Sequence, residues 1–312
     1  MSVALIAGGG ALPPHLAGSL MAQGRAPVIC ELRDHPSEVD GRFERVRFRL
    51  ETLGTFLETL SALGVREICM AGSVRRHQIH PAYIDDATVP LVPRLKSAMA
   101  RGDDGALREI VAIIREHGFT VVGAHDVDPG LLPHAGVHTT VAPPDLTDDL
   151  IAARSALAQM GRADMGQAML IRAGKVIARE DRHGTAAMLE ATHTPLTDQA
   201  APKSRIQSLA LLSAVVAALI AAIAAAIAWG GSFHSSDIKK KVQADGGFLF
   251  KAPKPDQMRV VDMPTIGPDT ARQAADAGLA GIVIQSNGVI VLDLPQVVAI
   301  LDARKMFLWV TP

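Results

Sequence analysis

The sequence predicts an α/β fold: an N-terminal Rossmann-like parallel sheet domain followed by a second α/β domain that an apolar helix interrupts. The first observation is that short apolar, strand-like runs alternate with helical patterns over residues 1–127. Such alternation is typical of a parallel sheet with right-handed crossovers. The second is that glycine-rich loops follow two of these runs, where such sheets bind ligands. The third is an uncharged stretch from Leu209 to Trp229.

The elements of the N-terminal domain follow from this periodicity. Apolar runs bounded by turn residues predict strands, and apolar residues spaced three to four apart predict helices. The expected strands are Val3–Ala7, Pro27–Leu32, Arg66–Ala71 and Thr120–Gly123. The expected helices are Pro14–Gln23, Leu53–Leu63, Pro93–Ala100 and Ala106–His117. We therefore expect a nucleotide-binding domain over residues 1–127.

A stretch rich in proline and glycine at residues 128–144 predicts a linker, so the second domain spans residues 145–312. Asn287-Gly288 predicts a two-residue hairpin turn before Val289–Leu292. The other expected elements are a helix from Thr147, a hairpin of Ala168–Ile171 and Val176–Ala178, strands Val260–Met263, Gly281–Gln285 and Phe307–Val310, and helices Asp269–Ala277 and from Gln296.

The composition excludes several classes of protein. A formal net charge of −1 implies no basic face, so nucleic acid is not an expected partner. The two cysteines, Cys30 and Cys69, lie in apolar strand-like runs and predict buried thiols without a disulfide or zinc site. The first residues lack a basic segment and are broken by glycines, so they predict a strand and not a signal peptide.

The apolar stretch predicts a hydrophobic helical insertion at about residues 205–230, long enough to span a bilayer. Lysine or arginine flanks it on both sides, so the positive-inside rule gives no orientation. Its alanine face suits close contact with protein or with a second copy of the chain, a possible homodimer. A helix that crossed the bilayer would place the two parts of the second domain on opposite sides of the membrane. We therefore expect membrane association without crossing.

The loop Ala7-Gly8-Gly9-Gly10-Ala11-Leu12-Pro13 joins the first strand to the first helix. Its glycines permit positive φ, and the helix start offers N–H groups to an anion, so a phosphate-bearing ligand is expected. Gly8 and Gly10 fit the dinucleotide fingerprint, but Pro13 replaces its third glycine. Glu31 lies about twenty residues on, where a ribose-binding acid is expected. A NAD-linked oxidoreductase is therefore one alternative, and a plain connecting turn is another.

Asp262 ends a short β-branched run and precedes the turn Met263-Pro264-Thr265. A strand that ends in an acid presents that acid at an edge, where it can hold a metal ion or a water molecule. The alternative is an aspartate that caps the following turn or helix.

Several short motifs recur in a specific order along the chain. They are Leu5-Ile6-Ala7-Gly8-Gly9-Gly10-Ala11-Leu12-Pro13, Ala71-Gly72-Ser73-Val74, Gly102-Asp103-Asp104, Gly123-Ala124-His125-Asp126, Asp164-Met165-Gly166-Gln167, Gly184-Thr185, Lys251-Ala252-Pro253-Lys254-Pro255, Asp262-Met263-Pro264-Thr265-Ile266-Gly267-Pro268 and Ala277-Gly278-Leu279-Ala280-Gly281-Ile282. In this order the chain resembles, over nearly its whole length, the LpxI family, the UDP-2,3-diacylglucosamine pyrophosphatases of lipid A biosynthesis.

The resemblance implies an enzyme that hydrolyses the pyrophosphate bond of UDP-2,3-diacylglucosamine to 2,3-diacylglucosamine 1-phosphate (lipid X) and UMP. It implies a requirement for Mg²⁺ or another divalent cation, and a place at the cytoplasmic face of the bacterial inner membrane. The diacylated UDP-sugar and inner-membrane lipid are then the partners. Asp262 is the implied catalytic residue and the best candidate metal ligand, acting either on the metal or as base to the water.

The resemblance also implies a set of substrate-binding residues. They are Gly9, Gly10, Ala11, Leu12, Gly72, Ser73, Val74, Gly184, Thr185 and Lys254. The chain departs from the family pattern at Ala186, Met258 and Val260, where acids and an arginine are usual. These departures keep open a non-catalytic, membrane-tethered nucleotide-sugar binder.

Overall fold

The computed structural model describes residues 2–74, 79–100, 102–163, 165–192 and 246–312. The predicted apolar insertion at about 205–230 lies outside these residues. No helix within the described ranges combines the length and apolar character needed to cross a membrane.

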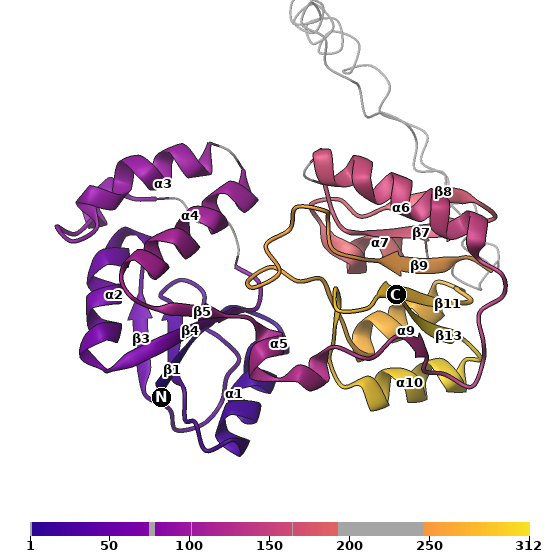
Figure 1. Cartoon of the computed structure of the whole chain (residues 1–312), viewed down its shortest axis with the longest axis horizontal. Coiled ribbons are helices and arrows are strands. Elements are labelled where there is room, and N and C mark those ends of the chain that lie inside the picture. Colours follow the sequence, from indigo (N-terminus) through magenta and orange to yellow (C-terminus); the bar gives the residue numbers. More distant parts are fainter. Residues whose placement is uncertain (1, 75–78, 101, 164, 193–245) are drawn as a thin grey trace, which may run out of the picture.

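A five-stranded parallel sheet forms the first half of the molecule, which Figure 1 shows beside the second half. Its strand order is β3-β2-β1-β4-β5, and the order reverses between β1 and β4. The strands are β1 (Ser2–Ala7), β2 (Val28–Leu32), β3 (Arg45–Phe48), β4 (Val65–Ala71) and β5 (Thr120–Val122). The helices are α1 (Leu12–Ala22), α2 (Leu53–Ala62), α3 (Val92–Met99), α4 (Asp103–Glu116) and α5 (Ala124–Val127).

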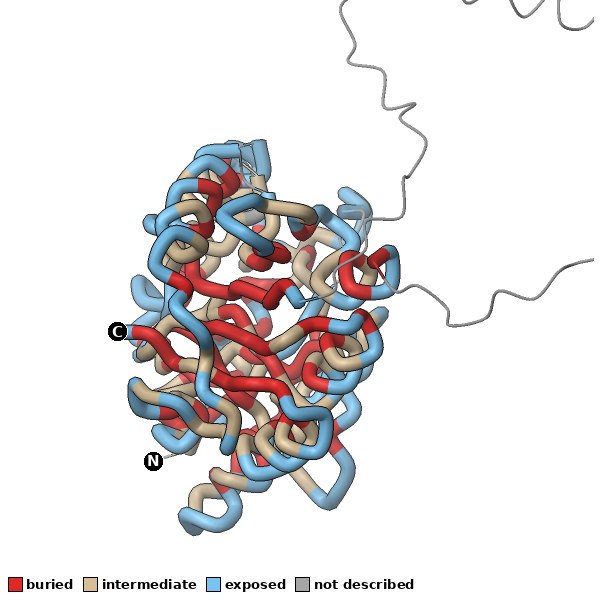
Figure 2. The backbone as a smooth tube through the Cα atoms, turned by 90° about the vertical axis from the view of Figure 1, so that its right-hand side faces the viewer, coloured by how far each residue is buried: buried red, intermediate tan, exposed pale blue. Residues whose placement is uncertain are grey.

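Both faces of this sheet are covered, which explains why its central strand is a continuous apolar run. Val3 and Leu5 of β1 join the apolar cluster that contains Leu16 and Leu20 of α1. Ala4 faces the opposite cluster, which α2 and α4 complete. Figure 2, which views the molecule from the side of its second half, shows buried residues inside and exposed residues on the outer turns. The predicted parallel sheet is therefore confirmed.

The second half contains a six-stranded mixed sheet of order β6-β13-β11-β9-β7-β8. Helix α6 packs on one face, and α7, α9 and α10 cover the other. The strands are β6 (Gly136–Val137), β7 (Ala168–Arg172), β8 (Lys175–Arg179), β9 (Phe248–Lys251), β11 (Gly281–Gln285) and β13 (Phe307–Thr311). The helices are α6 (Thr147–Arg162), α7 (Gly184–Thr192), α9 (Pro268–Asp276) and α10 (Leu294–Ala303).

Two local predictions in this half are wrong. The run Val260–Met263 forms turns and not a strand, because its apolar side chains pack against the first domain instead of pairing in a sheet. Val289–Leu292 does not form a hairpin with β11. Its strand β12 (Ile290–Val291) pairs in parallel with β10 (Thr265–Ile266), which makes a separate two-stranded sheet.

Further elements were missed, among them strands β3 and β6. Strand β3 is an edge strand whose Arg45 and Arg47 are exposed, so it has little of the apolar character that marks its neighbours. Strand β6 lies inside the stretch predicted as a linker and pairs antiparallel with β13.

The loop after β9 brings the two halves together, and Figure 1 shows it reaching from the second sheet toward the first. Val260 and Val261 pack against the α2–α4 face of the first sheet. Met263 packs against the α1 face. Arg108 of α4 also donates a hydrogen bond to the backbone carbonyl of Asp256. This loop therefore holds Asp262 over the carboxyl edge of the first sheet.

Candidate active site

The loops after β1 and β4 cross in direct backbone contact. Gly9 N donates to Ser73 O at 2.9 Å, and Ser73 N donates to Gly9 O at 3.0 Å. A Cβ on Gly8 would lie 2.5 Å from Ser73 O. One on Gly72, whose φ is +87°, would lie 2.7 Å from Gly9 O. The crossing therefore requires glycine at both positions.

This crossing decides which backbone amides can bind a ligand. The amides of Gly9 and Ser73 already bond to each other's carbonyls, so these two N–H groups are not available to a ligand. The amides of Gly10, Ala11 and Leu12 donate to no acceptor within the described chain. They stand at the start of α1, where unpaired N–H groups and the helix dipole favour an anion.

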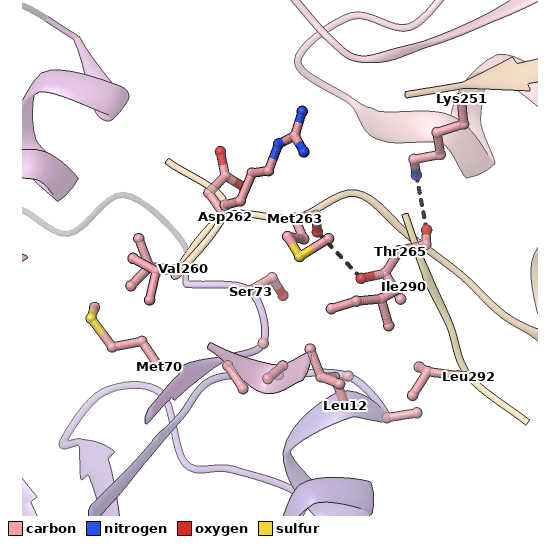
Figure 3. Close-up of a pocket in the computed structure, with 18 residues that line it drawn as sticks. Leu12, Met70, Ser73, Lys251, Val260, Asp262, Met263, Thr265, Ile290 and Leu292 are labelled. Carbon is pink, nitrogen blue, oxygen red and sulfur yellow. Dashed lines mark hydrogen bonds between the residues drawn. The ribbon is translucent and has the colours of Figure 1, made fainter. Parts of the chain in front are cut away.

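A cleft of about 390 Å³ opens between the two halves above these amides. Figure 3 shows Leu12, Met70 and Ser73 on one side, and Asp262, Met263, Thr265 and Lys251 opposite them. Asp262 is the one carboxylate that lines it among the described residues. Lys251 and Arg259 supply its cationic side chains.

Asp262 is half-buried and held by its own loop. Its Oδ2 accepts a hydrogen bond from Gln257 Nε2 at 2.8 Å, and its backbone N donates to Met258 O at 2.9 Å. Within the described chain Oδ1 has no hydrogen-bond donor. Asp262 thus presents one free carboxylate oxygen to a cleft that contains unpaired N–H groups.

Lys251, the last residue of β9, is the buried cation of the cleft, with 7% of its surface exposed. Its Nζ donates to Thr185 Oγ1 and to Thr265 O, each at 3.0 Å. Thr185 Oγ1 donates in turn to Glu180 Oε1 at 2.6 Å. Burial lowers the pKa of Lys251, and the negative charge of Glu180 offsets part of that effect.

The structure brings most, but not all, of the predicted site residues into this cleft. Val74 is 48% exposed and does not line it. Lys254 lies outside the lining, and its side-chain stem lies beside Gly161 of α6. Thr185 reaches the cleft through Lys251, and Gly184 precedes it at the start of α7. The predicted residues that do line the cleft are Gly9, Gly10, Ala11, Leu12, Gly72, Ser73 and Asp262.

Sequence reasoning gave no role to Lys251 or Arg259. Lys251 could have been found from the sequence, because it ends the otherwise apolar strand Phe248–Lys251. A charged residue is rarely buried in such a strand unless it serves a functional site. Arg259 lies between Met258 and Val260, and it lines the cleft together with Val260. The local pattern gave no such signal.

Glu31 does not form the ribose site of a dinucleotide. It is 2% exposed, and its Oε1 accepts hydrogen bonds from Ser37 and Arg45. Burial alone would raise the pKa of Glu31, but the hydrogen bonds from Ser37 and the charges of Arg45 and Arg47 outweigh it and lower the pKa. Protein groups thus already satisfy this carboxylate.

The fold and the cleft define a two-domain α/β protein whose crevice between the sheets contains unpaired N–H groups and cationic side chains. Residues 2–131 match the family model described as the LpxI N-terminal domain, and residues 134–204 and 213–309 match the LpxI C-terminal domain. The chain therefore belongs to the LpxI family. It is similar to the UDP-2,3-diacylglucosamine pyrophosphatase LpxI of Caulobacter vibrioides, with 31% identity over 304 residues, 97% of this chain and 95% of that relative.

Proposed function

We propose that this protein hydrolyses the pyrophosphate bond of UDP-2,3-diacylglucosamine, which yields lipid X and UMP in lipid A biosynthesis. The observation that carries the proposal is the cleft, where Asp262 faces the unpaired amides at the start of α1. Membership of the LpxI family and the name of the Caulobacter relative specify the substrate. Assay of the purified chain on the diacylated UDP-sugar, with lipid X and UMP as the measured products, tests it.

The described residues supply what hydrolysis of a phosphoric anhydride requires. That reaction depends on positioning a water molecule and on stabilising negative charge at the phosphates. The amides of Gly10, Ala11 and Leu12 bind phosphate oxygens, and Lys251 and Arg259 add positive charge. The free Oδ1 of Asp262 can accept a hydrogen bond from the attacking water molecule or can ligate a metal ion.

The donor set fits a magnesium ion that the substrate itself helps to hold. Mg²⁺ is usually bound through one or two carboxylates together with substrate phosphates, and not by a cage of protein ligands. The described residues contain no cluster of three or more histidines, cysteines or carboxylates for a metal, which is consistent with such a site. Asp262 would hold the ion, which supplies charge neutralisation at the phosphates when bound.

Activity is expected to require a divalent cation. Exhaustive chelation should abolish turnover, because one carboxylate and two cationic side chains leave the charge of a pyrophosphate only partly neutralised. Readdition of Mg²⁺ should restore the rate. Initial rates of UMP release before and after chelation measure this, and full activity of the metal-free protein would contradict the proposal.

The alternatives lose their structural basis. Pro13 and the occupied Glu31 do not support a NAD-linked oxidoreductase. A non-catalytic binder rested on the departures at Ala186, Met258 and Val260, yet Arg259, the neighbour of Val260, lines the cleft beside it. The cleft therefore contains an arginine guanidinium, although it comes from position 259 and not from position 260. Calorimetry that compares the binding of UMP and of NAD tests the oxidoreductase alternative. Turnover of the diacylated UDP-sugar tests the non-catalytic alternative.

Residues on either side of the apolar stretch belong to one packed body. Thr185, which precedes the stretch, accepts a hydrogen bond from Lys251, which follows it. Strand β9 pairs with β7, and α7 packs against α9. Both ends of the stretch must then lie on the same side of any membrane. We infer that residues 209–229 attach the enzyme to the cytoplasmic face of the inner membrane without crossing it.

Membrane attachment has a direct test. Deletion of residues 205–230 should release the protein from vesicles made from inner-membrane lipids, because the deleted stretch carries no charge between Leu209 and Trp229. Flotation of the full chain and of the deletion variant measures this. In intact spheroplasts, a cysteine placed at Ser286 should resist an external probe. Labelling of Ser286 from outside while an N-terminal probe stays protected would contradict attachment without crossing.

A further inference from the structure

Lys251 and Glu180, which belong to one hydrogen-bond network, have no role in the expectations drawn from the sequence. An ammonium group carries three N–H donors. Within the described residues, two of them bond to Thr185 Oγ1 and Thr265 O, and the third has no acceptor. Figure 3 shows the Lys251 side chain running from β9 to Thr265, at the edge of the same cleft as Asp262. Lys251 is therefore a buried cation with a donor unused beside the candidate site of phosphate chemistry.

The charge around this ammonium is not balanced by direct contact. Both acceptors of Lys251 are neutral, and no described carboxylate forms an ion pair with it. Glu180 is the nearest counter-charge along the network, and Thr185 separates it from Lys251. A buried cation is costly unless it is paired and fully hydrogen-bonded. A phosphate in the cleft would supply both the missing acceptor and the missing charge.

Glu180 and Thr185 are fixed on the protein side of the network. Glu180 is buried, and its Oε2 accepts from Gln167 N at 2.7 Å. Its Oε1 accepts from Thr185, whose hydroxyl proton is thereby committed, so Thr185 Oγ1 can only accept from Lys251. The donor and the acceptor of each hydrogen bond between Gln167 and the Lys251 ammonium are therefore fixed. Thr185 then acts through Lys251 and not by contact with the substrate.

We propose that Lys251 donates its third N–H to a phosphate oxygen of the substrate, and that Glu180 and Thr185 are positioning residues that hold the ammonium for this contact. The inference rests on the proposed hydrolysis of a UDP-sugar. It assigns the phosphate contact of this motif to Lys251, where the resemblance had implied Lys254. No bond to Lys251 forms or breaks in the reaction, since the ammonium contributes charge and a hydrogen bond.

The first test compares Lys251→Met with the wild-type chain and with Lys175→Met. Methionine keeps the length of the side chain without its charge, and the buried Glu180 keeps its hydrogen bonds from Thr185 Oγ1 and Gln167 N. Lys175 is an exposed lysine of the same domain, on β8, and serves as the matched control. Lys251→Met is expected to lose about 100-fold in kcat/KM for the diacylated UDP-sugar. Lys175→Met should match the wild type.

The second test uses the positioning residues and does not depend on how Lys251→Met folds. Thr185→Val should lower kcat/KM by about 10-fold. Thr185→Ser, which keeps the hydroxyl, should restore it. The ionisable groups around Lys251 are Glu180 behind Thr185, and Asp262 and Arg259 across the cleft. Because the Glu180 charge raises the pKa of Lys251, Glu180→Gln should shift the alkaline limb of the kcat/KM profile to lower pH.

The outcomes separate this inference from the proposed function. A wild-type chain that does not release UMP from the diacylated UDP-sugar would overturn the function itself. An active wild type together with a folded Lys251→Met of equal kcat/KM would overturn only the role of Lys251. If that variant does not fold, equal rates for Thr185→Val and Thr185→Ser, with an unmoved alkaline limb in Glu180→Gln, overturn it instead.

Discussion

Asp262→Asn is expected to fold normally, to bind UMP, and to lose at least about 100-fold in kcat. The reason is that Asp262 is the one carboxylate lining the cleft among the described residues. Asparagine has nearly the same shape, and its carbonyl oxygen can still accept the hydrogen bond from Gln257 Nε2. The loop should therefore keep its place while the negative charge is lost.

Asp256→Asn provides the matched control, because Asp256 is exposed in the same loop and lies outside the lining of the cleft. Its contact with Arg108 uses the backbone carbonyl, which the substitution leaves in place. Turnover, UMP affinity by calorimetry and the thermal unfolding midpoint should be measured for both variants. Wild-type turnover by a folded Asp262→Asn would remove Asp262 from the chemistry.

The sequence predicted the first sheet well because each signal there is local. A parallel strand buried on both faces is a continuous apolar run, as Val3–Ala7 of β1 and Ile68–Ala71 of β4 are, and the helices between them carry apolar residues at helical spacing. Strand β3 lacked this signal, since an edge strand exposes one side and two of its residues are arginines. Edge strands of a sheet are therefore harder to predict from the sequence than central strands.

The run Val260–Met263 shows where local pattern fails. β-branched residues next to one another predict a strand because they favour a pleated, half-buried surface. Here the burial comes from the other domain, against which Val260 and Val261 pack. A single sequence does not distinguish burial within a sheet from burial at an interface between domains. The acid at its end was nevertheless placed at the cleft, because this packing and a strand edge both present it there.

The meeting of the two glycine-rich loops was predicted from topology. Ligands bind at the carboxyl ends of parallel strands where the strand order reverses, which brings the loops after β1 and β4 together. Topology does not say which amides remain unpaired once the loops meet. It also does not distinguish Lys251 from Lys254, since only the end of β9 decides which lysine lines the cleft. Such details depend on contacts between residues far apart in the sequence.

Gly72→Ala is expected to destabilise the protein by about 3 kcal/mol and to weaken UMP binding strongly. Its φ of +87° strains any side chain, and the added Cβ would lie 2.7 Å from Gly9 O and 2.8 Å from the Pro13 ring. To relieve this contact the two loops must separate. Separation would break the paired bonds between Gly9 and Ser73 and shift the start of α1, where the unpaired amides are.

Gly118→Ala isolates the crowding from the backbone strain, because Gly118 has a φ of +86° and no atom within 4 Å of its added Cβ. It should cost about 1 kcal/mol, the strain of positive φ alone, and leave UMP affinity unchanged. Urea unfolding of both variants gives the two free energies, and calorimetry gives the affinities. The excess cost at Gly72 then measures how firmly the β1 and β4 loops are held together. Equal costs at the two positions, with UMP affinity intact, would mean that the two loops can separate without disturbing the unpaired amides at the start of α1.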